Sequence, residues 1–573
     1  MAEPPRNSPV VENWKFVISF PSADSCIEDH HKYPDALPFL TDKKGTKEHH
    51  DSLLDADVQI TVTQPNFASD PDVERKFWDG LEKVAEFIGT LTANKTIAID
   101  HLSYGNNIHA DLRCEAIVLR QARRITELRL GIDDEFQDIS HVDDFASALS
   151  SHSCLETWRL VDPLLDLLEV AGSSQILTRA LLSLPKLSIF PLEYYKIFDP
   201  DQLGNLVCRP AMRRMEFHAC DVAKWNEFFA GLATERTSVQ SLEIFDTFRP
   251  FDDEDGNGQL AEKLANALNT NRSLQTLKLM PPPSDEDDEL DDADEGAIQR
   301  QREAGRLLGE ALARHPALEN FALHFAWHKT FSLNVLATLS TSQRLQDLSL
   351  YKFEGTPEQC IYLLPVLQNM QLSQLVITGV EHADGVLATL AQARSTNLRI
   401  LSLHVSESVN SAQFLLLELG KLIESNLNSL KELSVPCFDT LCTFSDYISF
   451  LSAVKESQLS SLDLDFFIPS DDADICANSL IHAIKGSFNL MSFNINPLRR
   501  LAGKEIFPLL SLESIAACQG LLDMNRAGRR YILIDPLNKA QGIDVLASAH
   551  DKLDCLFLHL LENPFLCSAV HRK

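Results

Sequence analysis

The chain has 573 residues, 45% of them hydrophobic, and a formal net charge of −31 from 82 acidic and 51 basic residues. This length and apolar content suffice for a large folded core. The acidic balance disfavours a nucleic-acid partner, because such binding draws most of its affinity from basic side chains that neutralise phosphates.

The first residues and the cysteines bear on the compartment. The opening stretch MAEPPRNSPVVENW lacks the apolar core of a signal peptide, and no stretch approaches the length of a membrane-spanning helix. The twelve cysteines are scattered singly without a CxxC pair, which is typical of small buried side chains in a reducing compartment. We therefore expect no membrane binding and a location in the cytoplasm, with the nucleus as the alternative.

Residues 1–90 are predicted to form an amino-terminal α+β cap. Trp14–Phe20 and Val58–Val62 alternate as strands do, and Arg75–Leu91 is typical of an amphipathic helix. Between the two strands lie several side chains of the kinds that bind zinc: Cys26, His30, His31, His49 and His50. Their spacing matches no zinc module, so no metal site is predicted.

Residues 91–499 contain a repeat. Its clearest copies are RLQDLSL at Arg344–Leu350, LSQLVI at Leu372–Ile377 and LRILSL at Leu398–Leu403, and their first apolar residues are 27 and then 26 residues apart. Apolar residues occupy positions one, four and six, and the last two alternate with polar neighbours as a half-buried strand requires. In Gln259–Leu279 a stretch of helical periodicity precedes the strand. Each unit is thus a helix and a short strand, and stacked units bury a common core.

The same apolar frame is predicted along the whole repeat region. An irregular first strand fits Asn94–Ile99. The regular copies begin at Ile125, Leu155, Leu184, Met212, Val239, Leu274, Leu318, Leu345, Leu372, Leu398, Leu430, Leu459 and Leu490. An acidic insertion, residues 281–297, lengthens the interval after Leu274 to 44 residues and contains nine acidic residues in the eleven of DEDDELDDADE. Such a block is typical of a solvated segment, because like charges repel.

The repeat resembles the leucine-rich repeat proteins of the ribonuclease-inhibitor type, most clearly in Gln259–Leu279. The resemblance implies an α/β solenoid shaped as a horseshoe, with a parallel sheet on the concave face, helices on the convex face and a cap at each end. Where the family has Asn or Cys after the strand, this chain has Cys220 and Ser406 but also several Pro and Phe residues, so irregular loops are expected. Residues 500–573 are predicted to form the helical carboxy-terminal cap, with helices in Ile506–Asp523 and Gln541–Leu561.

Candidate partner-binding residues follow from the alternation of strand side chains. The residue between the second and third apolar positions points away from the core, toward the concave face. These positions are charged in the first half and mostly small in the second: Arg129, Arg159, Glu216, Glu243, Lys278, Ala322, Ser349, Val376, Ser402 and Ser434. Aromatic residues are favoured interface anchors, and three near the ends of strands are added: Phe325, Trp327 and Tyr351. For any single one of these aromatic residues, a role as core filler is favoured over a role in the interface.

The sequence contains no phosphate loop, GxGxxG, GxSxG or HExxH motif and no kinase signature set. We therefore predict a non-enzymatic scaffold without a cofactor, a monomer that binds a protein partner on its concave face. The acidic insertion favours a partner with a basic patch. Two alternatives stay open. One is a GTPase-activating regulator of a small GTPase, because an acidic leucine-rich array resembles the activators of the nuclear-transport GTPase. The other is a substrate-recognition adaptor of a ubiquitin ligase, because residues 33–54 resemble the F-box of such adaptors.

Overall fold

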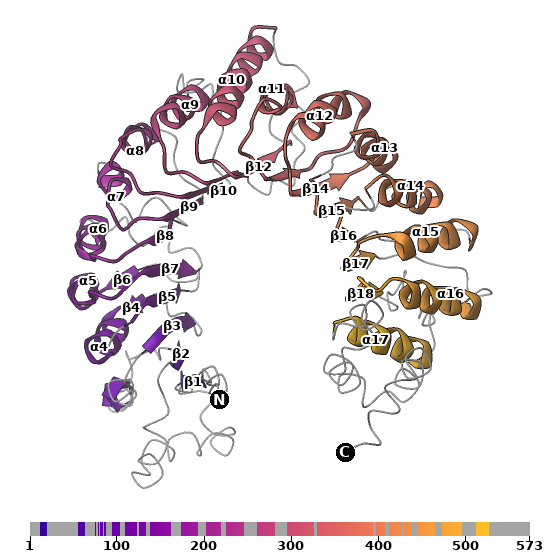
Figure 1. The fold of residues 1–573 in the computed structure, drawn as a ribbon. Coiled ribbons are helices and arrows are strands. Elements are labelled where there is room, and N and C mark those ends of the chain that lie inside the picture. The colour runs from indigo at the N-terminus through magenta and orange to yellow at the C-terminus, as the bar shows by residue number, and fades with distance from the viewer. Residues whose placement is uncertain are drawn as a thin grey trace, which may run out of the picture. The chain divides into compact units, whose positions relative to one another are not determined.

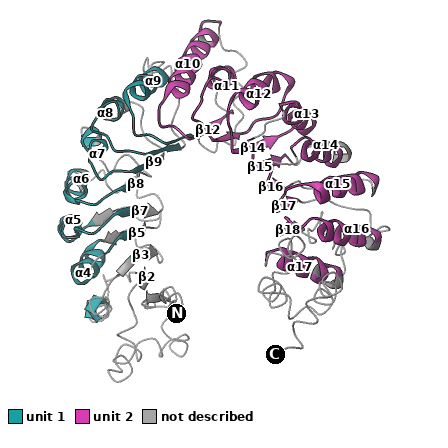
Figure 2. Cartoon of the chain, in the orientation of Figure 1, with its two compact units in different colours: residues 1–286 teal, residues 287–573 magenta. Residues whose placement is uncertain are grey.

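The computed structural model describes residues 12–19, 56–63, 94–102, 109–122, 125–132, 138–161, 173–192, 202–218, 225–245, 260–280, 295–325, 329–393, 397–406, 412–426, 429–436, 444–464, 473–495 and 512–526, and parts of 75–86. The chain divides into two compact units, residues 1–286 and 287–573 (Figure 2). Strands and helices alternate along both units (Figure 1).

In the first unit, parallel strands lie side by side in chain order, apart from β4 and β6, which pair with each other. The strands are β1 (Glu12–Ser19), β2 (Ala56–Thr63), β3 (Asn94–Leu102), β4 (His109–Asp111), β5 (Glu127–Ile132), β6 (Asp138–Ser140), β7 (Thr157–Val161), β8 (Ile189–Leu192), β9 (Arg214–His218), β10 (Ser241–Phe245) and β11 (Thr276–Leu279). The helices lie along one side of this sheet (Figure 1). They are α4 (Arg113–Gln121), α5 (Val142–Ser150), α6 (Ser173–Ser183), α7 (Leu203–Val207), α8 (Trp225–Leu232) and α9 (Leu260–Thr270).

The second unit repeats this plan. Its strands are parallel neighbours in chain order: β12 (Asn320–His324), β13 (Asp347–Tyr351), β14 (Gln374–Val380), β15 (Ile400–Val405), β16 (Glu432–Val435), β17 (Ser461–Leu464) and β18 (Ser492–Ile495). Its helices are α10 (Glu295–Arg314), α11 (Lys329–Leu339), α12 (Pro357–Asn369), α13 (Ala383–Ala393), α14 (Ala412–Ser425), α15 (Phe444–Glu456), α16 (Ala473–Gly486) and α17 (Leu512–Arg526). In each unit we call the side of the sheet without helices the open face.

Strand register explains why the apolar frame recurs. Leu375 of β14 pairs with Leu348 of β13 and with Leu401 of β15, and all three side chains are buried. Alternation along a strand sends these leucines toward the helices and their neighbours toward the open face. The core of each unit therefore lies between the sheet and its helices, as the helix-and-strand repeat predicts.

Strands β1 and β2, which precede the predicted repeat array, belong to the same sheet as the strands of the repeats. Phe16 of β1 pairs with Ile60 of β2, and Ile60 pairs with Ile99 of β3. The irregular strand predicted at Asn94–Ile99 is confirmed, with Ile97 and Ile99 buried. The cap boundary at residue 90 stays a prediction, but β2 pairs in parallel with β3, and β1 pairs in parallel with β2.

The strand start predicted at Leu184 was wrong. In β8, Phe190 pairs with Met215 and Pro191 pairs with Glu216, so the frame of this repeat begins at Leu187. Leu184 follows the last turn of α6 and is buried as completely as Leu187. Two buried leucines three residues apart satisfy the same pattern, and only the pairing with β9 distinguishes them.

Buried polar side chains join consecutive repeats where a helix ends. The Asn271 side chain is fully buried; its amide nitrogen donates to the carbonyl of Leu232, 3.0 Å away. Its oxygen accepts from the backbone N–H groups of Ser273 and Leu274, each at 2.9 Å. The amide of Asn525, at the end of α17, donates in the same way to the carbonyl of Ser487 at 2.9 Å. These bonds satisfy backbone groups that the end of a helix leaves without partners.

Several predicted segments lie beyond the described residues. The carboxy-terminal helix predicted at Ile506–Asp523 corresponds to α17, whereas Gln541–Leu561 lies outside the described residues. Most of the acidic insertion and the histidine-containing stretch of the amino-terminal region also lie outside them. Among the described residues, no helix combines the length and the apolar character that crossing a membrane requires.

Candidate functional site

The small residues predicted as a binding surface form one row across the second unit. In-register pairs connect Ala322, Ser349, Val376, Ser402 and Ser434. Asp463 of β17 continues the row beyond Ser434. The serines and Val376 are half-buried and lie on the open face. Ala322 is only 3% exposed, so a partner could touch little of it, and its assignment to the accessible surface was wrong.

A second row on the open face was missed by the sequence analysis. It lies two residues earlier in each strand and connects Asp347, Gln374, Ile400 and Glu432. The hydroxyl of Ser373 donates to a carboxylate oxygen of Asp347 at 2.9 Å and orients that side chain. Side chains alternate between the two faces of a strand, so two residues that are two positions apart lie on the same face. That signal was present in every copy of the repeat.

Tyr351 and His324 form an aromatic step at the end of β12 and β13. The two residues pair in register, and their rings are stacked with centroids 6.3 Å apart and planes 6° apart. His324 is 8% exposed. Burial, reinforced by the positive charge of Lys352, lowers the pKa of His324 to about 4. The ring is therefore neutral at pH 7, and Tyr351, which is half-buried, remains accessible as a predicted contact residue.

Phe325 belongs to the core. Its side chain is 5% exposed and meets the buried Phe353 edge-to-face, with ring centroids 5.1 Å apart. Its assignment as an interface anchor was wrong, because the strand end turns the ring inward, where it buries more apolar area than it could in a loop. Trp327, the other aromatic residue proposed near it, lies outside the described residues.

Charged residues on the open face of the first unit bind one another. Glu243 of β10 lies in register between Glu216 and Lys278. Its carboxylate is 3.0 Å from the side-chain nitrogens of both Lys278 and Arg214, and Arg214 also lies 2.6 Å from Glu216. The Glu243 side chain is 5% exposed. Two cations offset the cost of burying this carboxylate, so Glu243 is structural and its assignment as an accessible contact was wrong. Glu216 and Lys278 remain partly exposed members of the same network.

Two predicted arginines lie on neighbouring strands of the first unit. Arg129 of β5 and Arg159 of β7 pair in register. Arg129 is exposed and forms an ion pair with Glu127 at 2.7 Å. The side chain of Arg159 lies outside the described part of the chain. The structure thus places both arginines at the predicted positions of the sheet.

The described residues offer groups for non-covalent recognition. Hydroxyls, carboxylates and the accessible ring of Tyr351 share the open face of the second unit. Among the described residues, no three His, Cys, Asp or Glu side chains come together as a set that could hold a metal ion. No family model matches the chain, and no curated protein matches it.

Proposed function

We propose that this chain is a non-enzymatic protein-interaction scaffold of the leucine-rich repeat type. Its partner is a protein, which binds on the open face of the second unit. The horseshoe shape, the concave curvature of that face and the two terminal caps are part of this proposal. So are a monomeric state and a cytoplasmic location, which fits the free cysteines at Cys114, Cys154, Cys208, Cys360 and Cys518.

The observation that carries the proposal is the continuous parallel pairing of the strands from β12 to β18. Helices occupy the other side of the sheet, so this face is the large ordered surface that packing within the unit leaves accessible. Six intervals of about 4.8 Å give the seven strands a width of about 29 Å. A standard protein interface covers about 800 Å² per partner, equivalent to a square about 28 Å wide. The face therefore matches the width of such an interface.

The test replaces Ser349 and Ser402 together with arginine. Both serines are half-buried at the centre of the row, where a long charged side chain would clash with a partner and be desolvated. Partners are captured from the native cell by cross-linking and quantified by mass spectrometry. We expect the double variant to lose the partners that bind the unchanged chain. Its circular dichroism spectrum and melting temperature should stay nearly the same, because both side chains lie on the open face, away from the core, where substitutions usually change stability by less than about 0.5 kcal/mol.

A matched control places two arginines on the helical side of the same unit. Ser449→Arg and Ser452→Arg alter exposed positions of α15 with the same change in size and charge. This control should retain every partner. Equal losses in both variants, or unchanged capture by the Ser349→Arg and Ser402→Arg variant, would overturn the proposed site.

A further inference from the structure

Two β-branched apolar residues lie side by side on the open face of the second unit. Gln374 pairs with Ile400 and Val376 pairs with Ser402, so Val376 and Ile400 are diagonal neighbours on β14 and β15. Both are half-buried, whereas Leu375, which points toward the helices, is fully buried. Interfaces typically combine an apolar centre with a polar rim. Val376 and Ile400 supply the apolar centre of such a pattern.

Carboxylates flank this apolar centre on both sides. In the row that contains Ile400, Asp347 of β13 lies on one side and Glu432 of β16 on the other, and the uncharged Asn320 and Ser461 continue the row beyond them. Neither this row nor the adjacent row from Ser349 to Ser434 contains a lysine or arginine. Basic residues do precede β15 and β16, at positions 399 and 431, but alternation along the strand excludes them from both rows.

The first unit provides a contrast. There the open-face carboxylates have cations beside them: Glu127 pairs with Arg129, and Glu243 pairs with Lys278. In the second unit, Asp347 instead accepts a hydrogen bond from the hydroxyl of Ser373, which carries no positive charge. Its open face therefore presents an apolar centre between two negative ends.

The spacing of these groups defines what can bind. Three strand intervals of about 4.8 Å separate Asp347 from Glu432, a distance of about 14 Å. An extended chain advances about 3.4 Å per residue, so four residues cover this distance. Residues i, i+2 and i+4 of such a chain point to the same side. A segment crossing the strands could thus place its first and last side chains at the carboxylates and its middle one between β14 and β15, over Val376 and Ile400.

We infer that the open face of the second unit binds an extended segment of a partner protein with a basic residue at i, an apolar residue at i+2 and a basic residue at i+4. This inference rests on the proposed function and specifies the chemistry of its partner. The basic residues face Asp347 and Glu432, and the apolar residue covers Val376 and Ile400. The half-buried serines of the adjacent row leave room for the backbone of the segment.

The experiment uses the full chain and synthetic peptides as probes. One labelled peptide has the central sequence Lys-Ser-Leu-Ser-Lys, the second has Glu-Ser-Leu-Ser-Glu, and the third has the composition of the first with its two lysines adjacent. Fluorescence anisotropy at low salt gives the affinity of each. We expect the first peptide to bind at least tenfold more tightly than the other two, because only it matches both charge and spacing.

Charge reversal then tests the residues. The Asp347→Lys, Glu432→Lys variant should bind the spaced basic peptide at least tenfold more weakly. The control variant Glu424→Lys, Glu456→Lys makes the same change in net charge at exposed positions of α14 and α15 and should bind it as the unchanged chain does. Equal weakening in both variants would show attraction by net charge alone and would overturn the inference.

Other outcomes separate this inference from the proposed function. Preference for the acidic peptide, or binding of none of the peptides, overturns the basic segment. If captured partners are lost from the Ser349→Arg, Ser402→Arg variant but kept by the Asp347→Lys, Glu432→Lys variant, the inference fails and the proposed function stands. If both variants keep every partner, both fail.

Discussion

His324 shows how packing sets the protonation state of one side chain. Its ring is stacked on Tyr351, and burial together with the charge of Lys352 lowers its pKa to about 4. In the unfolded chain a histidine has a pKa of about 6.5. Between these values the unfolded state binds more protons than the folded state, so the free energy of unfolding falls as the pH falls. The contribution of a neutral His324 to stability is therefore complete above about pH 6.5 and is lost progressively toward pH 4.

We predict that His324→Phe makes the melting temperature less sensitive to acid. Phenylalanine can keep the stacking on Tyr351 but has no proton to bind. Calorimetric scans between pH 7.5 and 4.5 should show a smaller decrease in melting temperature for the variant than for the unchanged chain. Binding of up to one additional proton by the unfolded chain corresponds to a difference in the free energy of unfolding of up to about 1.4 kcal/mol per pH unit. His152, whose pKa is lowered by burial, contributes in the same direction in both proteins and so does not affect the comparison. Parallel decreases would mean that His324 is not held neutral.

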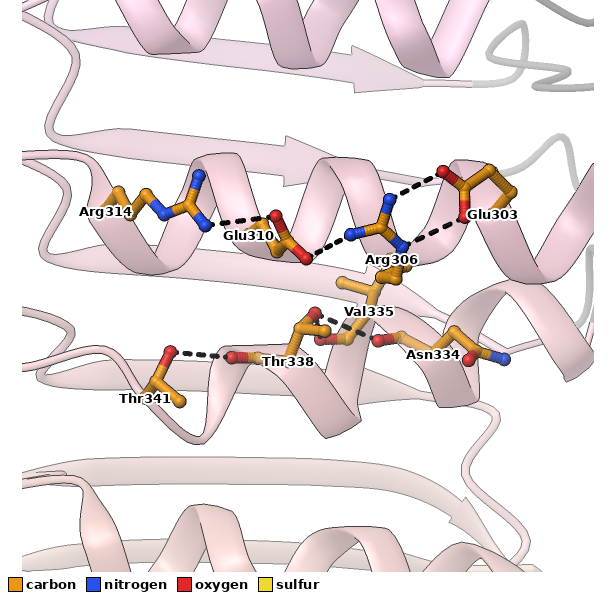
Figure 3. Close-up of polar contacts among 8 residues, drawn as sticks. All are labelled: Glu303, Arg306, Glu310, Arg314, Asn334, Val335, Thr338 and Thr341. Carbon is orange, nitrogen blue, oxygen red and sulfur yellow. Dashed lines mark hydrogen bonds and ion pairs between the residues drawn. The ribbon is translucent and has the colours of Figure 1, made fainter.

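The packing of α10 on α11 depends on glycine. A Cβ atom at Gly309 would overlap the Thr338 side chain and lie 2.8 Å from the carbonyl oxygen of Val335, and one at Gly305 would overlap the carbonyl of Phe331. Figure 3 shows Val335 and Thr338 of α11 beside α10. Two glycines one helical turn apart therefore allow the backbones to approach closely.

Ion pairs along α10 contribute less to this packing. Arg306 bridges Glu303, at 2.6 Å, and Glu310, which also lies 3.1 Å from Arg314 (Figure 3). All four residues belong to α10, so these pairs support the helix without attaching it to α11. Exposed pairs at this spacing stabilise a helix only weakly, because water and salt screen the charges.

We predict that Gly309→Ala lowers the melting temperature although alanine favours a helix. Alanine gains about 1 kcal/mol in helix propensity, but overlap with backbone atoms forces the two helices apart, at a cost of about 1–3 kcal/mol or more. Gly420→Ala in α14 is the matched control, because a Cβ there would meet its nearest atom, the Cα of Phe450, at an ordinary 3.7 Å. Calorimetry should show an equal or higher melting temperature for the control. A stabilising effect of both variants would contradict the close packing of α10 on α11.

The net charge acts on the whole molecule. A formal charge of −31 makes the compact state repel itself at pH 7, and salt screens this repulsion over a Debye length of about 10 Å at 0.1 M. We predict that raising sodium chloride from about 0.02 to 0.3 M increases the melting temperature at pH 7. Near the sequence isoelectric point of about 4.9 the effect should largely vanish, because the net charge is then small. The same salt dependence at both pH values would show that specific ion binding, and not self-repulsion, is responsible.

The boundary between the two units falls in an acidic stretch of the sequence. The units meet in sequence at residues 286 and 287, inside the predicted acidic insertion 281–297. Apolar spacing alone would have continued the repeat across this interval. A block of like charges buries little apolar area, so it lengthens the sequence interval between two apolar copies of the repeat. The composition of the sequence thus marks the boundary without describing how the parts are arranged.

Local periodicity was enough to predict most strands. Leu348, Leu375 and Leu401 occupy equivalent register positions because each copy of the repeat carries the same alternation and the same helix before it. Both periods are properties of short stretches of chain, and repeated copies stack in equivalent positions. The frame, the buried leucines and the row from Ser349 to Ser434 were therefore predictable from the amino-acid sequence by itself.

Accessibility on the open face depended on neighbouring strands. Sequence alternation places Glu243 and Ala322 on that face, yet both are buried, Glu243 beneath Arg214 and Lys278 from the strands beside it. Phe325 comes directly after β12, and Tyr351 is the last residue of β13. The ring of Phe325 turns into the core, whereas the ring of Tyr351 stays partly exposed. The periodicity of a strand determines the side on which a residue lies. How much of that residue a partner can reach depends on the length and charge of side chains tens of residues away, which only the packed sheet brings next to it.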